Sequence, residues 1–152
     1  MLFRSCQLSV TAAVSDAKRF YEPEEDGVFD IGISGDGTWR RRYSSLYGIV
    51  TAISTVTGKV IDIEIMSKDC KECTVRRNKE GTQEFEDWWV GHQHLCQTNQ
   101  LGSSGSIDAT GLLPIFQLSV ESYAVHYTEF LGHGDSKAHK LIVDEVVKES
   151  DG

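Results

Sequence analysis

Three short segments of alternating hydrophobicity, all within residues 28–66, constrain the fold of this chain most. In residues 28–34 the apolar side chains of Phe29, Ile31 and Ile33 alternate with polar or small ones. Residues 47–54 are rich in Ile, Val and Thr, and residues 60–66 place Ile61, Ile63 and Ile65 at every second position. Alternation with a period of two is typical of half-buried strands. The pattern therefore predicts a three-strand meander in about forty residues.

The remaining periodic segments predict an α/β fold. Residues 108–123 show helical spacing, with Pro114 expected in the first turn, and residues 124–131 alternate like a strand. Residues 137–148 predict a second helix. Three strands followed by helix, strand and helix indicate a mixed sheet flanked by helices. Two stretches lack a long period: residues 1–27, a poorly patterned N-terminal segment that precedes a domain over 28–152, and residues 67–111, an insertion in that domain.

Composition limits the classes of function. The chain has 152 residues and a formal net charge of −8, which disfavours a protein that binds nucleic acid over its whole surface but is compatible with a local basic groove. No run of 18 apolar residues is present, which predicts no membrane partner. The N-terminus lacks the pattern of a secretory signal, so we expect a nuclear or cytoplasmic protein rather than a secreted one.

The cysteines and histidines of the insertion show the most specific spacing. Two residues separate Cys70 from Cys73, 18 separate Cys73 from His92, and three separate His92 from Cys96. Thiolate and imidazole ligands in two short pairs suit tetrahedral Zn²⁺, and four protein ligands make such a site structural. His94 is the alternative ligand to His92, although its spacing to Cys96 strains a shared tetrahedron. Reduced cysteines beside incidental histidines remain the other interpretation.

Two carboxylates lie in Gly-rich segments at expected strand exits. Asp36 follows the first predicted strand, and Asp135 precedes the last predicted helix. Either aspartate suits an ordinary turn. Together they suit a divalent cation, since Mg²⁺ is bound through one or two carboxylates. Residues 40–42 (RRR) are either a phosphate contact or a solvated charge run. Trp88 and Trp89 suit base stacking, but their place between acidic residues and the cysteines favours packing over the cysteine-rich loop.

Five motifs in this order resemble the Mutator-like transposase domain. They are residues 30–39 (DIGISGDGTW), the Cys70 and Cys73 pair, the His92 and Cys96 pair, residues 102–106 (GSSGS) and residues 134–137 (GDSK). The resemblance implies a ribonuclease-H-like mixed sheet with a zinc-stapled insertion. It also implies an Asp-Asp-Glu triad that holds Mg²⁺ or Mn²⁺, and transposon-end DNA as the partner.

Carried over residue by residue, the family's first catalytic aspartate falls on Asp36. His133 stands where the second aspartate is expected, and Asp135 follows two residues later. Imidazole is a poor substitute for a hard anionic Mg²⁺ ligand. The third carboxylate has no counterpart before Gly152, so we expect a fragment of a transposase, incomplete at the C-terminus and inactive as it stands. The alternative is a non-catalytic, zinc-stapled binding module derived from a transposon.

Overall fold

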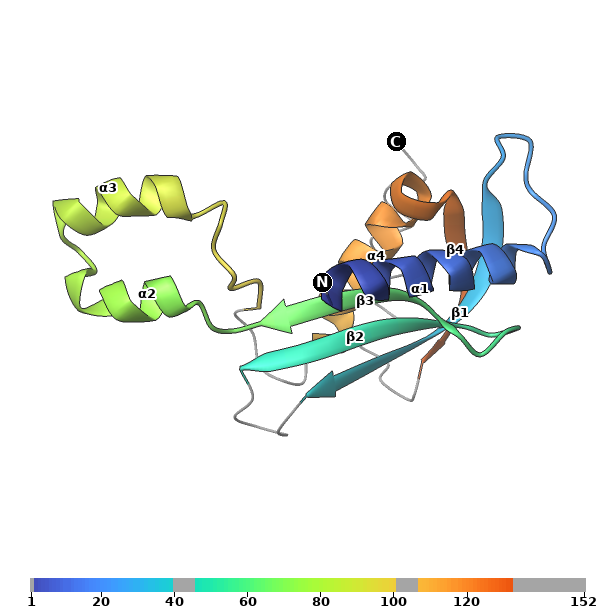
Figure 1. Ribbon diagram of the computed structural model, residues 1–152, viewed down its shortest axis with the longest axis horizontal. Helices are drawn as coiled ribbons and strands as arrows, with labels where there is room; N and C mark the ends of the chain where they lie inside the picture. Colours follow the sequence, from blue (N-terminus) through green and yellow to red (C-terminus); the bar gives the residue numbers. More distant parts are fainter. Residues whose placement is uncertain (1, 40–45, 101–106, 133–152) are drawn as a thin grey trace.

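The computed structural model describes residues 2–39, 46–100 and 107–132, which form a mixed α/β fold with a four-stranded sheet. The strands are β1 (Phe29–Trp39), β2 (Tyr47–Ser54), β3 (Val60–Ser67) and β4 (Val125–Gly132). Their spatial order is β3-β2-β1-β4. The first three strands pair antiparallel, and β4 pairs parallel with β1 (Figure 1). The predicted meander and mixed sheet are both confirmed.

The first strand is longer than its alternation indicates. Residues 35–38, where the sequence predicts a turn that closes the strand, continue it instead, because Gly35 pairs with Ala52 and Asp36 with Thr51 inside β1. A Cβ on Gly35 would lie 2.6 Å from a ring carbon of Phe130 and 2.9 Å from a methyl of Leu112. Glycine is therefore required here because neighbouring side chains approach the backbone closely, and not because the chain turns. The prediction that Asp36 lies at a strand exit is wrong.

The helix α4 (Ile107–Tyr123) crosses the sheet and covers its core. It begins one residue before the predicted position and ends at the predicted one. Leu112 and Ile115 are buried against the sheet, while Ile31 and Ile33 of β1 are buried beneath them as the alternation predicts. Pro114 lies in the middle of this helix and not in its first turn. Burial of both Leu112 and Ile115 outweighs the missing N–H of the proline.

The first 27 residues contain a 17-residue helix, α1 (Leu2–Lys18), that the sequence analysis missed. Its buried residues Val10, Ala13, Val14 and Ala17 have helical spacing and join the core. Small alanines make this stripe inconspicuous in the sequence. Figure 1 shows α1 and α4 on the same side of β2 and β3.

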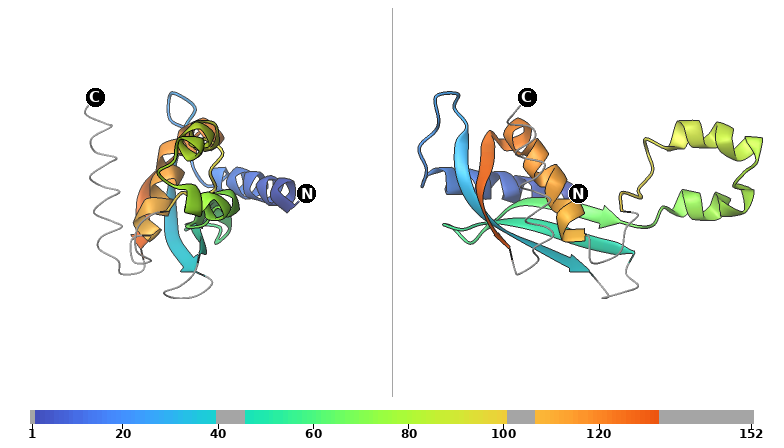
Figure 2. Two further views of the ribbon diagram at one scale, coloured as in Figure 1. Left: turned by 90° about the vertical axis from the view of Figure 1, so that its left-hand side faces the viewer. Right: turned by 180° about the vertical axis from the view of Figure 1, so that it is seen from behind.

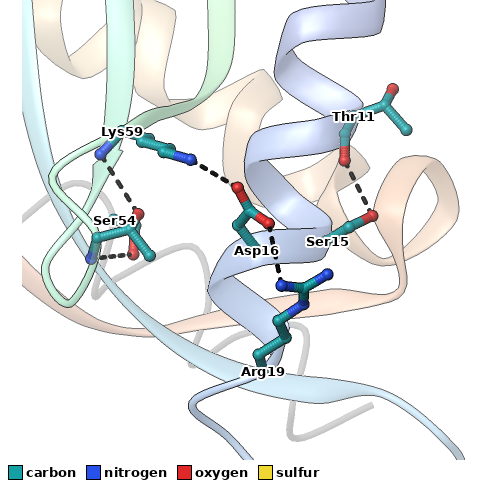
Figure 3. A network of polar contacts seen from close by, with 7 residues as sticks. Thr11, Ser15, Asp16, Arg19, Ser54 and Lys59 are labelled. Carbon is teal, nitrogen blue, oxygen red and sulfur yellow. Dashed lines mark hydrogen bonds and ion pairs between the residues drawn. The ribbon is translucent and has the colours of Figure 1, made fainter.

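Polar contacts attach α1 to its neighbours. Lys59, in the turn between β2 and β3, forms an ion pair with Asp16, which also faces Arg19 (Figure 3). The hydrogen bond and charge of Lys59 lower the pKa of Asp16. At the end of α1, Lys18 Nζ donates to the backbone carbonyl of Tyr123. The helix is thus bound to both the sheet and α4.

The two faces of β3 differ from the prediction. Its register with β2 is irregular between Ala52 and Ile53, where Ile61 lies in an extra position and is buried. Cross-strand partners point to the same face of a sheet, so Asp62 and Glu64 share the helix-covered face with Ala52 and Val50. The predicted single face of Ile61, Ile63 and Ile65 is therefore wrong: the irregularity moves Ile61 to the core side, and Ile65 is 46% exposed.

An arm formed by α2 (Lys71–Arg76), the 3-10 turn η1 (Arg77–Lys79) and α3 (Gln83–His92) projects from the end of β3. The view from behind shows it extending away from the sheet (Figure 2, right). None of the residues of α2 or η1 is buried, and His92 is the buried residue of α3. This arm occupies the predicted insertion, whose short helices lacked a recognisable period because they have no apolar core.

Candidate metal centre

Four side chains of the arm converge on one point. The ligand atoms of Cys70, Cys73, His92 and Cys96 all lie within 4.8 Å of one another. His92 Nε2 lies 3.3 Å from Cys70 Sγ and 3.4 Å from Cys73 Sγ, and the sulfurs of Cys73 and Cys96 are 3.6 Å apart. All three of these cysteines are free thiols, since a disulfide requires about 2.05 Å between the sulfurs.

Local structure holds these ligands in place. Cys70 is the N-cap residue of α2, and its carbonyl accepts from the N–H of Thr74, so Cys73 follows in the first turn. His92 is the last residue of α3, whose start is fixed by Thr82, because its hydroxyl accepts from the N–H of Phe85. Cys96 follows after the chain turns back, where Leu95 N–H donates to the carbonyl of His92. Two short helices thus bring both ligand pairs together.

The spacing of the donor atoms fits a tetrahedral zinc ion. Bonds of about 2.3 Å to sulfur and about 2.0 Å to nitrogen place tetrahedral ligand atoms roughly 3.5 to 3.8 Å apart. The three short distances in the cluster lie close to that range, and Cys70 and His92 are almost completely buried. The donor set therefore fits a closed structural site.

The electrostatics of the thiols point to a cation. The backbone N–H groups of Cys73 and Gln97 lower the pKa of Cys70 to about 6. Burial and the neighbouring thiols raise the pKa of Cys73. Three sulfurs this close cannot all be thiolates unless a positive charge lies between them. A divalent ion would supply that charge.

Two further contacts orient His92. Its Nδ1 atom lies 3.1 Å from Glu72 Oε2, on a carboxylate that is 70% exposed. Trp88 stacks on the imidazole with ring centroids 4.4 Å apart, and the guanidinium of Arg76 lies over the Trp88 ring, 4.8 Å from its centroid. The expectation that the tryptophans cover the cysteine-rich loop is thus confirmed for Trp88. The contact of Glu72 with His92 was not predicted from the sequence. The signal available was an acidic residue between the two cysteines of the first ligand pair.

Asn99 closes the base of the arm. Its Oδ1 atom accepts from Ser67 N–H at 2.6 Å, and its Nδ2 atom donates to the carbonyl of Ile65 at 2.7 Å. The backbone N–H groups of Asn99 and Gln100 both donate to the Ser67 carbonyl. The chain therefore leaves β3 and returns to it at one point. No spacing in the sequence indicates this role.

The structure distinguishes between the two candidate histidines. His92 belongs to the cluster, whereas His94 is exposed and outside it. His92 is the last residue of α3 and its side chain is buried in the cluster. His94 lies in the turn that follows the helix, where its side chain is exposed.

Asp36, the candidate catalytic carboxylate, lies elsewhere, on the sheet. It is exposed, and it shares a face with Thr51 and Ile63, opposite the helix-covered side. Gly35 pairs with Gly132 at the end of β4, so the chain leaves β4 beside Asp36. His133, Asp135, the basic residues 40–42, the GSSGS segment and the predicted helix 137–148 lie outside the described residues. Within the described ranges, no group of three or more ligand side chains includes Asp36.

A mixed α/β sheet domain with a Cys/His-centred arm defines the class of this protein. A family model described as Mutator-like transposase matches residues 5–151. The chain therefore belongs to the Mutator-like transposase family. Neither a curated protein nor a solved structure matches it. Among the helices of the described part, none is both long and apolar enough to cross a membrane.

Proposed function

We propose that this chain is a transposase-derived domain whose arm is held together by one structural Zn²⁺. The observation that carries the zinc assignment is the convergence of three sulfurs and one imidazole nitrogen within 4.8 Å. The ion would be bound by Cys70, Cys73, His92 and Cys96. Thiolate ligands of this kind suit a reducing compartment, nuclear or cytoplasmic.

Metal analysis of single-residue variants tests the zinc site. The purified chain should carry about one Zn²⁺, and Cys73→Ser or His92→Ala should lose it. Cys6→Ser and His94→Ala are matched controls, because both side chains are exposed and lie outside the cluster. A folded, metal-free protein with an intact arm would contradict the assignment.

The proposed partner is DNA, with Asp36 and Asp135 as the remaining metal-binding carboxylates of a ribonuclease-H-like site. Two features support this proposal: the family match over residues 5–151, and the parallel pairing of β1 with β4, which a ribonuclease-H-like sheet requires. In a complete site of the parent family, Mg²⁺ or Mn²⁺ would stabilise the attacking and leaving oxygens of the phosphodiester.

We further propose that the chain does not cleave or join DNA as it stands. His133 occupies the position expected for the second aspartate, and a neutral imidazole cannot offset the charge of two divalent cations. Nicking of a labelled duplex carrying candidate element ends, with Mg²⁺ or Mn²⁺, is the measurement. We expect none. Metal-dependent nicking that disappears in Asp36→Ala would overturn this proposal.

A non-catalytic binding module is the second candidate function. The arm favours it, because it exposes apolar side chains: Val75 of α2 is 78% exposed, Val90 of α3 is 67% exposed, and Leu95 in the turn after α3 is 69% exposed. Exposed apolar side chains near one another mark interaction surfaces. Loss of partner or DNA binding in Val90→Asp, with zinc retained, would support a binding module; nicking activity would favour the enzyme.

A further inference from the structure

A cavity of about 520 Å³ lies along β3, and its lining shares no residue with the cysteine cluster and does not include Asp36. Its lining includes Cys6 and Val10 of α1, Tyr123 at the end of α4, and the consecutive residues 62–65 of β3. Consecutive strand residues point to alternate faces, so a cavity lined by all four follows the outer edge of this strand. In the described part of the sheet, β3 is an edge strand. The volume is that of a small-molecule site.

The lining of this cavity includes two carboxylates, those of Asp62 and Glu64. Asp62 and Glu64 lie on the same face, two residues apart and hence about 7 Å apart along the strand. Asp62 accepts hydrogen bonds from Tyr127 Oη at 3.3 Å and from the N–H of Ile63 at 2.9 Å. Among the described residues, no lysine, arginine or histidine forms an ion pair with either carboxylate.

Partial burial makes this charge costly. Loss of solvent raises the pKa of Asp62 to about 6 and also raises the pKa of Glu64. A carboxylate that is withdrawn from water is stabilised by an incoming opposite charge. Val10, Ile65 and the ring of Tyr123 supply an apolar wall beside these acids.

The edge of β3 is poorly suited to an added strand. The N–H of Ile63 donates to the carboxylate of Asp62, and the carbonyl of Ile65 accepts from Asn99 Nδ2. Ser67 uses both its N–H and its carbonyl with Asn99. Because these groups already have partners, a peptide strand would gain few ladder hydrogen bonds there. A compact ligand fits the cavity better than an extended chain.

We propose that this cavity binds a small organic cation, a protonated amine attached to an apolar or aromatic body. The ammonium group would lie between the carboxylates of Asp62 and Glu64. Its body would pack against Val10 and Ile65, with the Tyr123 ring available for a cation–π contact. Neither the zinc site nor transposase activity is needed for this binding.

The experiment compares 2-phenylethylamine, which is protonated at pH 7.5, with the neutral 2-phenylethanol of similar shape. Binding is read from the rate at which iodoacetamide alkylates Cys6, measured by mass spectrometry of the peptide that contains it. Cys6 lines the cavity and is exposed. We expect saturating amine to slow alkylation of Cys6 at least threefold, and the alcohol to bind at least tenfold more weakly.

Charge-neutralising variants test whether the amine binds at Asp62 and Glu64. The double variant Asp62→Asn with Glu64→Gln should weaken amine binding at least tenfold and remove the preference over the alcohol. Its matched control is Glu86→Gln with Asp87→Asn, the same change of charge on the exposed surface of α3. That control should bind the amine like the unaltered chain.

A second variant tests the cavity independently, in case the Asp62/Glu64 double variant does not fold. Cys6→Trp fills the cavity from an exposed helix position without touching either acid, and amide chemical shifts of β3 then replace the alkylation readout. It should abolish the amine-induced shifts. Equal binding of the alcohol, no binding of the amine, or unchanged binding in the Asp62/Glu64 double variant would overturn the proposal.

Discussion

The imidazole of His92 lies between Glu72 and the thiols: Nδ1 is 3.1 Å from Glu72 Oε2, and Nε2 is 3.3 Å from Cys70 Sγ. This arrangement assigns the two ring nitrogens. Nδ1 carries the proton and donates a hydrogen bond to the carboxylate, so the lone pair of Nε2 points to the centre of the cluster. A carboxylate behind a metal-binding histidine fixes the ring and raises its basicity.

Removing Glu72 should therefore weaken zinc binding. We expect Glu72→Ala to reduce zinc affinity about tenfold, the lower end of the usual range, because this carboxylate is 70% exposed. Glu72→Gln should cost less, since its amide oxygen still accepts from Nδ1. Competition with a chromophoric chelator measures the affinity. Glu80→Ala, another exposed acid of the arm, is the control, and equal losses in both variants would contradict the role of Glu72.

Asn99 should matter for the attachment of the arm and not for its metal. Asn99→Ala removes the acceptor for Ser67 N–H and the donor to the Ile65 carbonyl, at a cost of about 1–2 kcal/mol. The expected changes are a lower melting temperature and faster hydrogen exchange at the Ser67 amide, with zinc content unchanged. Asn78→Ala, at an exposed position of η1, should change neither. Loss of zinc in Asn99→Ala would contradict this prediction, because it would show that the metal centre depends on the attachment of the arm to β3.

Gly111 should tolerate no side chain, although it lies in a helix. A Cβ at this position would lie 2.4 Å from Val50 Cγ2 and 2.9 Å from Val50 Cβ, where α4 crosses β2. Gly111→Ala should destabilise the fold by about 1–3 kcal/mol, since overpacking outweighs the gain in helix propensity. The matched control is Gly91→Ala in α3, where nothing lies within 4 Å and a neutral or stabilising effect is expected. Denaturant unfolding of both variants compares them.

Asp62 should make stability depend on pH. Burial raises its pKa to about 6 in the folded chain, above the value near 4 expected when unfolded. Between these values the folded state binds more protons, so the contribution of Asp62 to stability falls as pH rises from about 4 through 6.

Asp62→Asn should remove this dependence. We expect the gain in the free energy of unfolding from this substitution to be about 1–2 kcal/mol larger at pH 8 than at pH 4. This value is lower than the full pKa shift implies, because Asp62 is partly exposed to solvent. Urea unfolding of the variant and the unaltered chain at both pH values measures this difference. Glu86→Gln, on an exposed side chain, is the control. An equal effect of Asp62→Asn at both pH values would contradict the role of burial.

Most strands and the crossing helix were determined by local sequence alone. The predictions for β2, β3, β4 and α4 agree with the observed bounds to within one residue, because each segment has a clear period. The ligand set Cys70, Cys73, His92 and Cys96 also follows from spacing, since two short pairs need only local helices to approach each other.

Tertiary structure decided what depends on contacts between distant residues. The helix α1 is stable because its small residues pack on the sheet, and Gly35 belongs to a strand because Phe130 and Leu112 occupy the space above it. The choice of His92 over His94, the contact of Glu72 with the ring and the closure of the arm by Asn99 arise in the same way. Asp62 and Glu64 face the helices because they pair with Ala52 and Val50, and one strand irregularity beside Ala52 brings Ile61 to the same side. Periodicity reports which residues share a face of their own element, whereas pairing, burial and close approach are set by side chains far away in the sequence.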